Sequence, residues 1–220
     1  METLRLGGHA LAPLPCGALF WPARRLLIVA DLHLEKGSAL ARQGWLVPPY
    51  DSRDTLARLE RAIATTGATA VLALGDSFHD AAGPCRLPDA ERQRLAALIA
   101  RVDWTWIVGN HDGHAPGTLG GRVVREWEVE GLRFRHEAGG AGPEVSGHFH
   151  PKVRLPGVRG PARRCFALAG ERLVLPAYGS YAGGLDIASP ELAEALGEPP
   201  VALLPSARGI VRIVPERCAA

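Results

Sequence analysis

Continuous apolar stretches alternate with amphipathic segments along the first half of the chain. Three such stretches, each typical of a strand covered on both faces, occupy residues 26–30, 70–74 and 104–108. Between the first two, the pattern predicts a helix from residue 51 or 52 to about residue 66, ended by Gly67. A second helix is expected after Pro88. Their apolar faces hold Leu56, Leu59 and Ile63 in the first helix, and Leu95, Leu98, Ile99 and Val102 in the second.

The second half has a different pattern, in which short strands follow one another. Strands at residues 123–129 and 132–135 are joined by Glu130-Gly131, a pair typical of a hairpin turn. Further short strands are expected at residues 144–146, 164–168, 172–175 and 209–214, with a short helix near 190–196 and a lead-in of short strands over 1–22. The pattern predicts an α/β protein with an α+β second half. No repeat or linker interrupts the sequence, so we expect one domain over residues 1–220.

Composition is ordinary for a folded protein. The 220 residues can bury a sizeable core, and 47% are hydrophobic and 22% charged. The net charge of +2 is too small to indicate a nucleic-acid partner by itself. The basic residues are almost all arginine, with lysine only at Lys36 and Lys152. Genomic composition explains this bias more simply than recognition of phosphate by guanidinium groups, although both interpretations stay open.

Cysteine usage and the apolar stretches bear on the cellular setting. The four cysteines form no CxxC pair, which favours a reduced cytosolic environment. The first twelve residues lack the charged and apolar regions of a signal peptide. No apolar stretch approaches the roughly 20 residues that a membrane helix needs. We therefore expect a soluble, cytoplasmic protein without a membrane partner.

Side chains suited to metal binding follow most of the apolar stretches directly. They form five segments, Asp31-Leu32-His33, Gly75-Asp76, Gly109-Asn110-His111-Asp112, His136, and Gly147-His148-Phe149-His150. Because open α/β sheets form their active sites at the carboxyl ends of the strands, we expect these segments to converge. Hydrolysis of a phosphate ester by two cations about 3.5–4 Å apart needs a bridging carboxylate and several imidazoles. The sequence therefore predicts a two-metal phosphoesterase site.

Each segment alone has a more ordinary explanation. An Asp-any-His pair occurs by chance in many chains, Asp76 could cap a helix, and a single histidine such as His136 is more often a hydrogen-bonded group than a ligand. The ordered set of five is what favours a metal site. On extended backbone, residues two apart point to the same side, so residues 31 and 33 should face one way, as should 148 and 150.

The segment 109–112 adds acid–base chemistry. The Asn110 carbonyl is a suitable oxygen donor for a hard divalent ion. His111 can remain off the metal and protonate the leaving oxygen, because imidazoles exchange protons near neutral pH. Asp112 would then orient or stabilise that imidazole.

The ordered series DLH, GD, GNHD, a single His and GHFH resembles the calcineurin-like metallophosphoesterases over residues 31–150. The resemblance implies a two-sheet β-sandwich flanked by helices. It also implies that a first metal is held by Asp31, His33 and His150, and a second by Asn110, His136 and His148. Asp76 would bridge both ions, and His111 would act as general acid with Asp112 behind it.

One position departs from that family. Many members have a second aspartate three residues after the bridging one, where this chain has His79, followed by Asp80. The change leaves the implied ligands intact but alters the groups near the substrate. We expect His79 to lie close to the scissile phosphate or to a metal-bound water, and to serve catalysis.

Four further segments resemble the bacterial ligase-associated metallophosphoesterases. They are DLHLEKG at 31–37, PPYD at 48–51, GDSFHD at 75–80 and LPAYGSYAGGLD at 175–186. The resemblance implies a manganese-dependent phosphodiesterase that cuts single-stranded DNA in the response to DNA damage. A water activated by two metals would attack the phosphodiester. It also implies a functional link to an ATP-dependent DNA ligase and a helicase. The mixed oxygen and nitrogen ligands themselves admit manganese, iron and zinc.

A single-stranded DNA substrate needs an electropositive track and surfaces for base stacking. Arg154, Arg159, Arg163 and Arg164 follow the last ligand segment and form either such a track or a solvated loop. Trp45, Phe78, Phe149, Tyr178 and Tyr181 are candidate stacking residues, of which Phe78 and Phe149 lie within the metal-binding segments. The expected substrate-binding residues are Arg154, Arg163, Arg164, Phe149 and Phe78.

Two other functions remain open from the sequence. The same metal site serves small-molecule nucleotide phosphodiesterases and phosphatases, because the surrounding loops choose the substrate. A non-catalytic scaffold with this fold is disfavoured, because the chain keeps every expected ligand and His111.

Overall fold

The computed structural model describes residues 1–112, 115–155 and 157–215. The first large sheet contains, in spatial order, β1 (Leu4–Leu6), β2 (His9–Pro13), β3 (Leu19–Trp21), β4 (Leu26–Val29), β5 (Ala70–Leu74), β6 (Asp103–Ile107) and β7 (Arg122–Val124). The second contains β16 (Gly209–Ile213), β15 (Val201–Ser206), β13 (Phe166–Ala169), β14 (Arg172–Val174), β10 (Glu144–Ser146), β9 (Leu132–Arg135) and β8 (Glu126–Val129). A small sheet pairs β11 (Lys152–Val153) with β12 (Arg163–Arg164).

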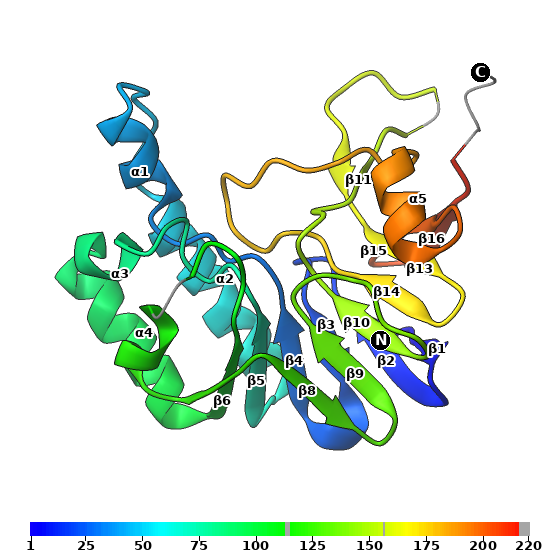
Figure 1. The fold of residues 1–220 in the computed structure, drawn as a ribbon, viewed down its shortest axis with the longest axis horizontal. Coiled ribbons are helices and arrows are strands. Elements are labelled where there is room, and N and C mark those ends of the chain that lie inside the picture. The colour runs from blue at the N-terminus through cyan, green and yellow to red at the C-terminus, as the bar shows by residue number, and fades with distance from the viewer. Residues whose placement is uncertain (113–114, 156, 216–220) are drawn as a thin grey trace.

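The helices are α1 (Lys36–Arg42), α2 (Asp51–Thr66), α3 (Gly83–Arg86), α4 (Asp89–Arg101) and α5 (Pro190–Leu196), with short 3₁₀ turns at Pro22–Arg24 and Ala115–Leu119. The two large sheets pack face to face, with α2 and α4 outside the first sheet and α5 outside the second (Figure 1). The expected two-sheet sandwich flanked by helices is therefore confirmed. In the part of the chain that the structure describes, none of the helices has the length and apolar character to cross a membrane.

Strands β4, β5, β6 and β7 are parallel, whereas β1 to β4 pair antiparallel. All four residues of β4 are buried, as expected for a strand covered on both faces. This burial accounts for the continuous apolar sequence of the strand. The carboxyl ends of β4, β5 and β6 meet at one edge of the sheet. Residues 31, 76 and 109–112 follow these ends, so the fold gathers the predicted ligand segments there.

Apolar side chains fill the space between the two large sheets. Trp21 of the first sheet and Phe134 of the second are fully buried, with ring centroids 6.2 Å apart. Trp127 also packs against Phe134, at 5.7 Å between centroids. Burial of aromatic side chains contributes much of the free energy that holds such layers together.

Several predicted elements are confirmed. The helix expected to end at Gly67 is α2, and Gly67 takes the left-handed conformation (φ 64°) that glycine adopts easily at a helix end. In α4, Leu95 and Leu98 are buried against the core. The hairpin at Glu130-Gly131 has positive φ at both residues, 52° and 76°, as a type I′ turn requires.

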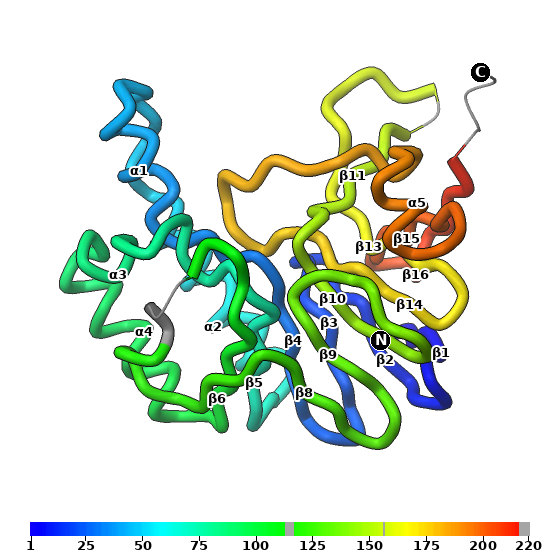
Figure 2. Tube along the Cα trace, in the orientation of Figure 1, coloured from blue at the N-terminus to red at the C-terminus, as the bar shows by residue number. Residues whose placement is uncertain are grey.

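Two predicted strands are wrong in their extent. The expected strand at residues 123–129 is divided at Arg125 into β7, which pairs with β6, and β8, which pairs with β9. The chain thus passes from the first sheet to the second between neighbouring residues (Figure 2). Likewise, the expected strand at 164–168 is divided at Cys165 into β12 and β13, which belong to different sheets. Strands β11 and β15 and helices α1 and α3 were not predicted.

Replacing Phe134 with alanine should reduce the free energy of unfolding by about 3–5 kcal/mol, because it leaves a cavity between the two sheets. Urea denaturation of the purified variant measures this. Val211→Ala in β16 is a suitable control, since Val211 is 51% exposed; it should change stability by less than about 0.5 kcal/mol. A Phe134→Ala variant as stable as the control would contradict the proposed contribution of this layer.

Candidate metal centre

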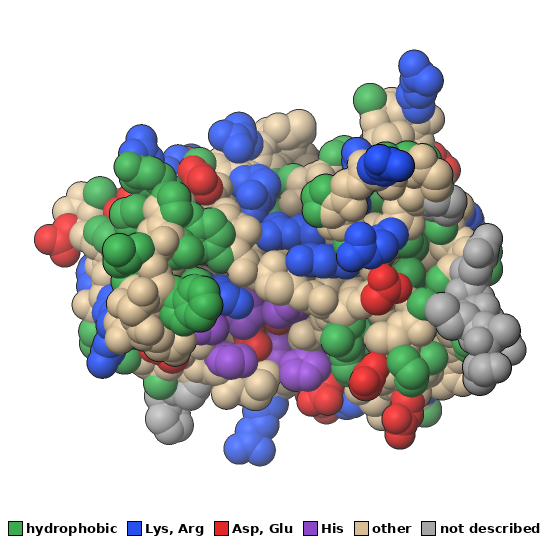
Figure 3. Space-filling model, turned by 90° about the horizontal axis from the view of Figure 1, so that it is seen from above, with side chains coloured by type: hydrophobic (Ala, Val, Ile, Leu, Met, Phe, Trp, Pro, Cys, Tyr) green, Lys and Arg blue, Asp and Glu red, His purple; other side chains and the backbone are tan. Residues whose placement is uncertain are grey.

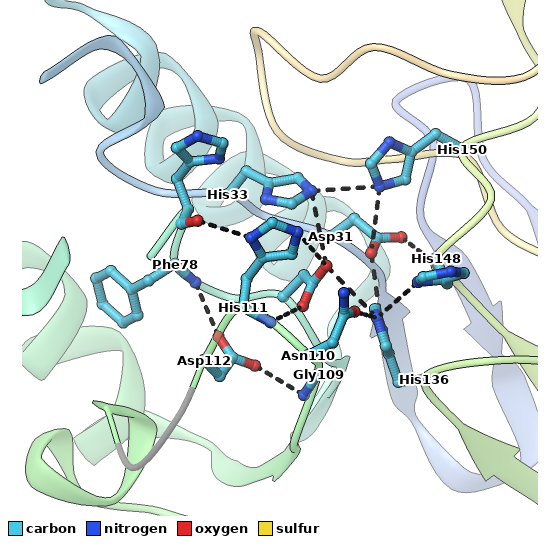
Figure 4. A network of polar contacts seen from close by, with 12 residues as sticks. Asp31, His33, Phe78, Gly109, Asn110, His111, Asp112, His136, His148 and His150 are labelled. Atoms are coloured by element: carbon cyan, nitrogen blue, oxygen red, sulfur yellow. Dashed lines mark hydrogen bonds and ion pairs between the residues drawn. The ribbon is translucent and has the colours of Figure 1, made fainter. Parts of the chain in front are cut away.

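Two groups of potential metal ligands lie side by side at this edge of the sheets (Figure 4). The first group is Asp31, His33 and His150; the second is Asp76, His136 and His148. Within each group the ligand atoms all lie within 4.8 Å of one another. Each group combines residues that follow strands of the first sheet with residues that follow strands of the second.

The imidazole nitrogens approach each other as ligands of a common ion do. The Nε2 atoms of His33 and His150 are 3.3 Å apart, and Nδ1 of His148 is 3.2 Å from Nε2 of His136. Two ligands bound to one ion at about 2.1 Å each lie about 3 Å from one another. In addition, the buried Asp31 Oδ1 has no hydrogen-bond partner among the described residues, and it lies 3.3 Å from His150 Nε2. These features fit a divalent cation in each group.

Asp76 and Asn110 complete the arrangement that the resemblance implies. The Asp76 Oδ2 atom lies 3.4 Å from Nε2 of His136 in the second group and 4.0 Å from Nε2 of His33 in the first. It is therefore placed between the groups, where a bridging carboxylate is needed. The Asn110 Oδ1 atom lies 2.8 Å from His136 Nε2, beside the second group.

Burial and close charges shift the pKa values of these ligands in the metal-free protein. Burial, aided by the neighbouring His150, lowers the pKa of His33 to about 3, so this imidazole is neutral and able to bind a cation. Burial opposes the charged forms of Asp76 and His136, but the attraction between the two groups, whose Oδ2 and Nε2 atoms lie 3.4 Å apart, prevails. It lowers the pKa of Asp76 to about 2 and raises that of His136 to about 9. A cation at the second group must therefore displace a proton from His136.

Five of these ligands have backbone in the left-handed region, which non-glycine residues seldom adopt. They are Asp31 (φ 54°), His33 (41°), Asp76 (46°), His148 (69°) and His150 (49°). Backbone strain of this kind is concentrated at functional sites. The left-handed backbone also corrects the expectation that the Asp-any-His and His-any-His segments are extended. Residues 31 and 33 nevertheless belong to one group, whereas residues 148 and 150 belong to different groups, as the resemblance implies.

The glycines of the ligand segments permit close packing between segments. A Cβ atom at Gly75 would overlap the His136 ring, and one at Gly109 would overlap the backbone nitrogen of Asp76. No side chain fits at either place. The glycine of one segment thus makes room for the ligand of another.

His111 lies beside the two groups without belonging to either (Figure 4). Its Nδ1 atom is 3.0 Å from the carbonyl oxygen of His79, and its side chain is 43% exposed. The His79 ring lies nearly parallel to the His111 ring, at 16° and 5.7 Å between centroids. The structure therefore brings both predicted catalytic histidines to the open side of the ligand groups.

We expected the Asp112 carboxylate to orient the His111 ring, but its hydrogen bonds go to backbone amides instead. Its Oδ1 atom accepts a hydrogen bond from the Phe78 amide and its Oδ2 atom accepts one from the Gly109 amide, each at 3.0 Å. Burial raises the pKa of this carboxyl group. Asp112 therefore ties together the loops that carry Asp76 and Asn110, and the backbone carbonyl of His79 orients the imidazole instead.

The aromatic side chains predicted to stack on bases differ in how exposed they are. Phe78 is fully buried in the core, so its expected role in substrate binding is wrong. Tyr178 is also fully buried, whereas Trp45 is 69% exposed. Phe149 is half-buried against the core beneath α5, and its ring lies 5.0 Å from that of His148.

The predicted arginines also differ from one another. Arg163 of β12 and Arg154, which follows β11, are exposed. Arg164 is half-buried and donates hydrogen bonds to the carbonyl oxygens of Gly179 and Ser180. Its guanidinium group holds a loop in place, and its donors are therefore not free for a substrate phosphate.

Interactions between the side motifs were not predicted from the sequence. The Gly37 amide donates to Asp51 Oδ2 at 2.9 Å, and the Ser52 hydroxyl donates to the buried Glu35 at 2.7 Å. Tyr181 donates its hydroxyl proton to the carbonyl oxygen of Pro48. Segments 31–37, 48–51 and 175–186 therefore meet beside the first ligand group. The presence of all three segments in one sequence could have indicated that they interact. The sequence does not, however, contain the distances between them.

The family of the chain follows from comparison with known proteins. Residues 24–166 match the family described as calcineurin-like phosphoesterase, and the chain belongs to this family of metal-dependent hydrolases. The crystal structure of Pseudomonas putida nuclease MPE is similar, with 30% sequence identity and a TM-score of 0.76. That similarity covers 96% of this chain and 99% of the nuclease. No curated protein matches the sequence.

A second solved structure, the phosphoesterase Yfce from E. coli, is more distant. It shares 16% sequence identity with a TM-score of 0.45, over 86% of this chain and 98% of that one.

Replacing Gly109 with alanine should lower the affinity for divalent metal by about 10- to 100-fold, because the new Cβ atom displaces Asp76. Metal content after dialysis, together with titration calorimetry, measures the effect. Gly183→Ala is the matched control, since a Cβ atom there meets no atom within 4 Å. Equal metal affinity in the two variants would show that metal binding does not depend on the present position of Asp76.

Proposed function

We propose that this protein is a metal-dependent phosphodiesterase that cuts single-stranded DNA internally and takes part in DNA repair in the cytoplasm. The observation that carries the proposal is the pair of ligand groups joined by Asp76, with His111 open beside them. The similarity to a nuclease over nearly the whole length of both chains supports nucleic acid as the substrate.

Two divalent cations would be held by Asp31, His33 and His150 on one side and Asn110, His136 and His148 on the other, with Asp76 between. When bound, such a pair of cations supplies Lewis-acid activation of water and neutralises charge on the phosphoryl oxygens. We take manganese as the metal, because the mixed oxygen and imidazole ligands admit it and the resemblance to the ligase-associated family favours it.

The orientation of His111 suits a general acid. Nδ1 lies 3.0 Å from the carbonyl oxygen of His79. A carbonyl oxygen only accepts, so Nδ1 carries a proton and donates a hydrogen bond to that oxygen. The other nitrogen, Nε2, then faces the ligand groups, at 3.9 Å from Asp76 Oδ2. In the imidazolium form Nε2 also carries a proton, which can pass to the leaving oxygen of the phosphodiester and leave the neutral ring protonated at Nδ1. His79, stacked beside it, would contact the phosphate itself.

The surface around the site favours a polyanionic substrate. Histidine side chains gather in the centre of the face shown in Figure 3, and a row of Lys and Arg side chains borders them. The exposed Arg154 and Arg163 would bind the DNA backbone, and the half-buried Phe149 would offer an edge to an unpaired base. A functional link to an ATP-dependent DNA ligase and a helicase is part of the proposal.

The wild type with added manganese should cut circular single-stranded DNA, and His148→Ala should not, because the variant lacks a ligand of the second group. Gel electrophoresis of the circle and its linear product measures this. Arg208→Gln, at the exposed turn between β15 and β16, is a control that should cut normally. Hydrolysis of bis(4-nitrophenyl) phosphate is assayed in parallel.

Each pattern of activity has a distinct meaning. Cutting of the circle by the wild type alone supports the endonuclease. Hydrolysis of the small diester without cutting of DNA would move the substrate to small nucleotides. Bound metal without hydrolysis of either substrate would indicate a non-catalytic scaffold.

The His111→Ala variant should lose about 10²- to 10⁴-fold in DNA turnover while keeping its metal, because a general acid contributes about this much. The loss should be smaller with bis(4-nitrophenyl) phosphate, since nitrophenolate leaves without a proton. His79→Ala should lower turnover more than metal content. Rate measurements paired with metal analysis test both variants. Equal losses on both substrates would exclude the acid role for His111, and unchanged turnover would remove His79 from the site.

A further inference from the structure

The only two lysines of the chain lie beside the same ligand group. Lys36 begins α1, three residues after His33, and Lys152 lies in β11, two residues after His150. Both histidines belong to the first group. The two lysines thus approach this group from opposite halves of the chain, although the remaining basic residues are all arginine.

Neither lysine is paired with a carboxylate of residues 1–112, 115–155 or 157–215. Among the described residues, the Lys36 ammonium group has no hydrogen-bond or ion-pair partner, although its side chain is half-buried. The Lys152 ammonium group has one partner, the Ala182 carbonyl oxygen at 3.4 Å. The half-buried Arg86 differs, because it pairs with Asp80 at 2.8 Å. Two half-buried cations beside the first ligand group therefore have no carboxylate partner in the part of the chain that the structure describes.

The two lysines are anchored on neighbouring ligands of the first group. The Lys36 amide donates to the His33 carbonyl oxygen at 3.3 Å, and the Nε2 atoms of His33 and His150 lie 3.3 Å apart. The ring of His79, the predicted catalytic histidine, lies 5.7 Å from the ring of His33, between centroids. Like charges held together without an anion repel each other, so binding of an anion between them is favourable.

The backbone holds Lys152 in this place. Its amide donates to the Leu185 carbonyl oxygen at 2.8 Å, and its own carbonyl accepts from the Ile187 amide at 2.7 Å. A Cβ atom at Gly184 would lie 3.1 Å from Cε of Lys152 and would overlap the carbonyl oxygen of His150. The lysine stem is therefore packed along this loop, next to the ligand that precedes it.

We propose that Lys36 and Lys152 together bind a phosphate of the DNA backbone that neighbours the scissile phosphate. The inference rests on the proposed function and adds a subsite to it. Lysine ammonium groups bind phosphate oxygens as point charges. A small diester has one phosphate, which would be bound at the metal centre beside His111, so it gains nothing from this subsite. The lysine pair thus selects a polynucleotide over a small phosphodiester.

The test compares Lys36→Gln and Lys152→Gln with wild type on two substrates, a single-stranded oligonucleotide and bis(4-nitrophenyl) phosphate. Each variant should lose about tenfold in kcat/KM for the oligonucleotide, because a charged hydrogen bond is removed. Each should stay within about twofold for the small diester. The slope of log kcat/KM against log salt should fall in magnitude by about 0.7 per lysine removed.

Charge-matched controls separate the subsite from general electrostatics. Arg208→Gln removes one positive charge at the exposed β15–β16 turn and should leave both substrates unaffected. Lys36→Arg and Lys152→Arg should restore most of the oligonucleotide activity.

Two results would overturn the inference. Equal losses on both substrates would place the lysines at the scissile phosphate, and unchanged oligonucleotide kinetics would remove them from the DNA path. Failure of the proposed function looks different, because the wild type itself would then leave the oligonucleotide uncut while hydrolysing the small diester.

Discussion

The Asp76 carboxylate is the interaction on which the arrangement of the site depends. Its Oδ1 atom accepts a hydrogen bond from the His111 amide at 2.9 Å, and its Oδ2 atom faces His136 from the other sheet. Gly109 lies so close that no side chain fits between the two segments. One buried carboxylate, the proposed bridging ligand, therefore fixes the positions of His111, the proposed general acid, and of the His136 imidazole relative to each other.

The two sheets meet at this site through backbone as well as side chains. The Tyr178 amide donates to the Ala30 carbonyl oxygen at 2.8 Å, which joins the end of β4 to the loop after β14. The His148 amide donates to Asp31 Oδ2 at 2.9 Å across the same junction. Because each ligand group takes residues from both sheets, the packing of the sandwich determines the spacing of the ligands.

Much of the fold could be predicted because buried strands and amphipathic helices have distinct periods, and Gly67 marks a helix end. The ligand segments could be found because they follow strand ends. Other features depend on tertiary contacts that periodicity does not contain. The change of sheet at Arg125 follows from strand pairing, and the burial of Phe78 beside a polar segment follows from packing. The hydrogen-bond partners of Asp112 are backbone amides, which cannot be predicted from the pattern of side chains along the sequence.

The separation of the ligands along the chain links the metal to folding. His33 and His150 are 117 positions apart, yet their Nε2 atoms lie 3.3 Å from each other. An ion shared by these residues would act as a reversible cross-link that closes a very long loop, and such links restrict the unfolded chain most strongly. Metal supply would thereby govern how long the polypeptide survives in the cell, as well as whether it is active, because an unloaded chain unfolds more often and is more accessible to proteases.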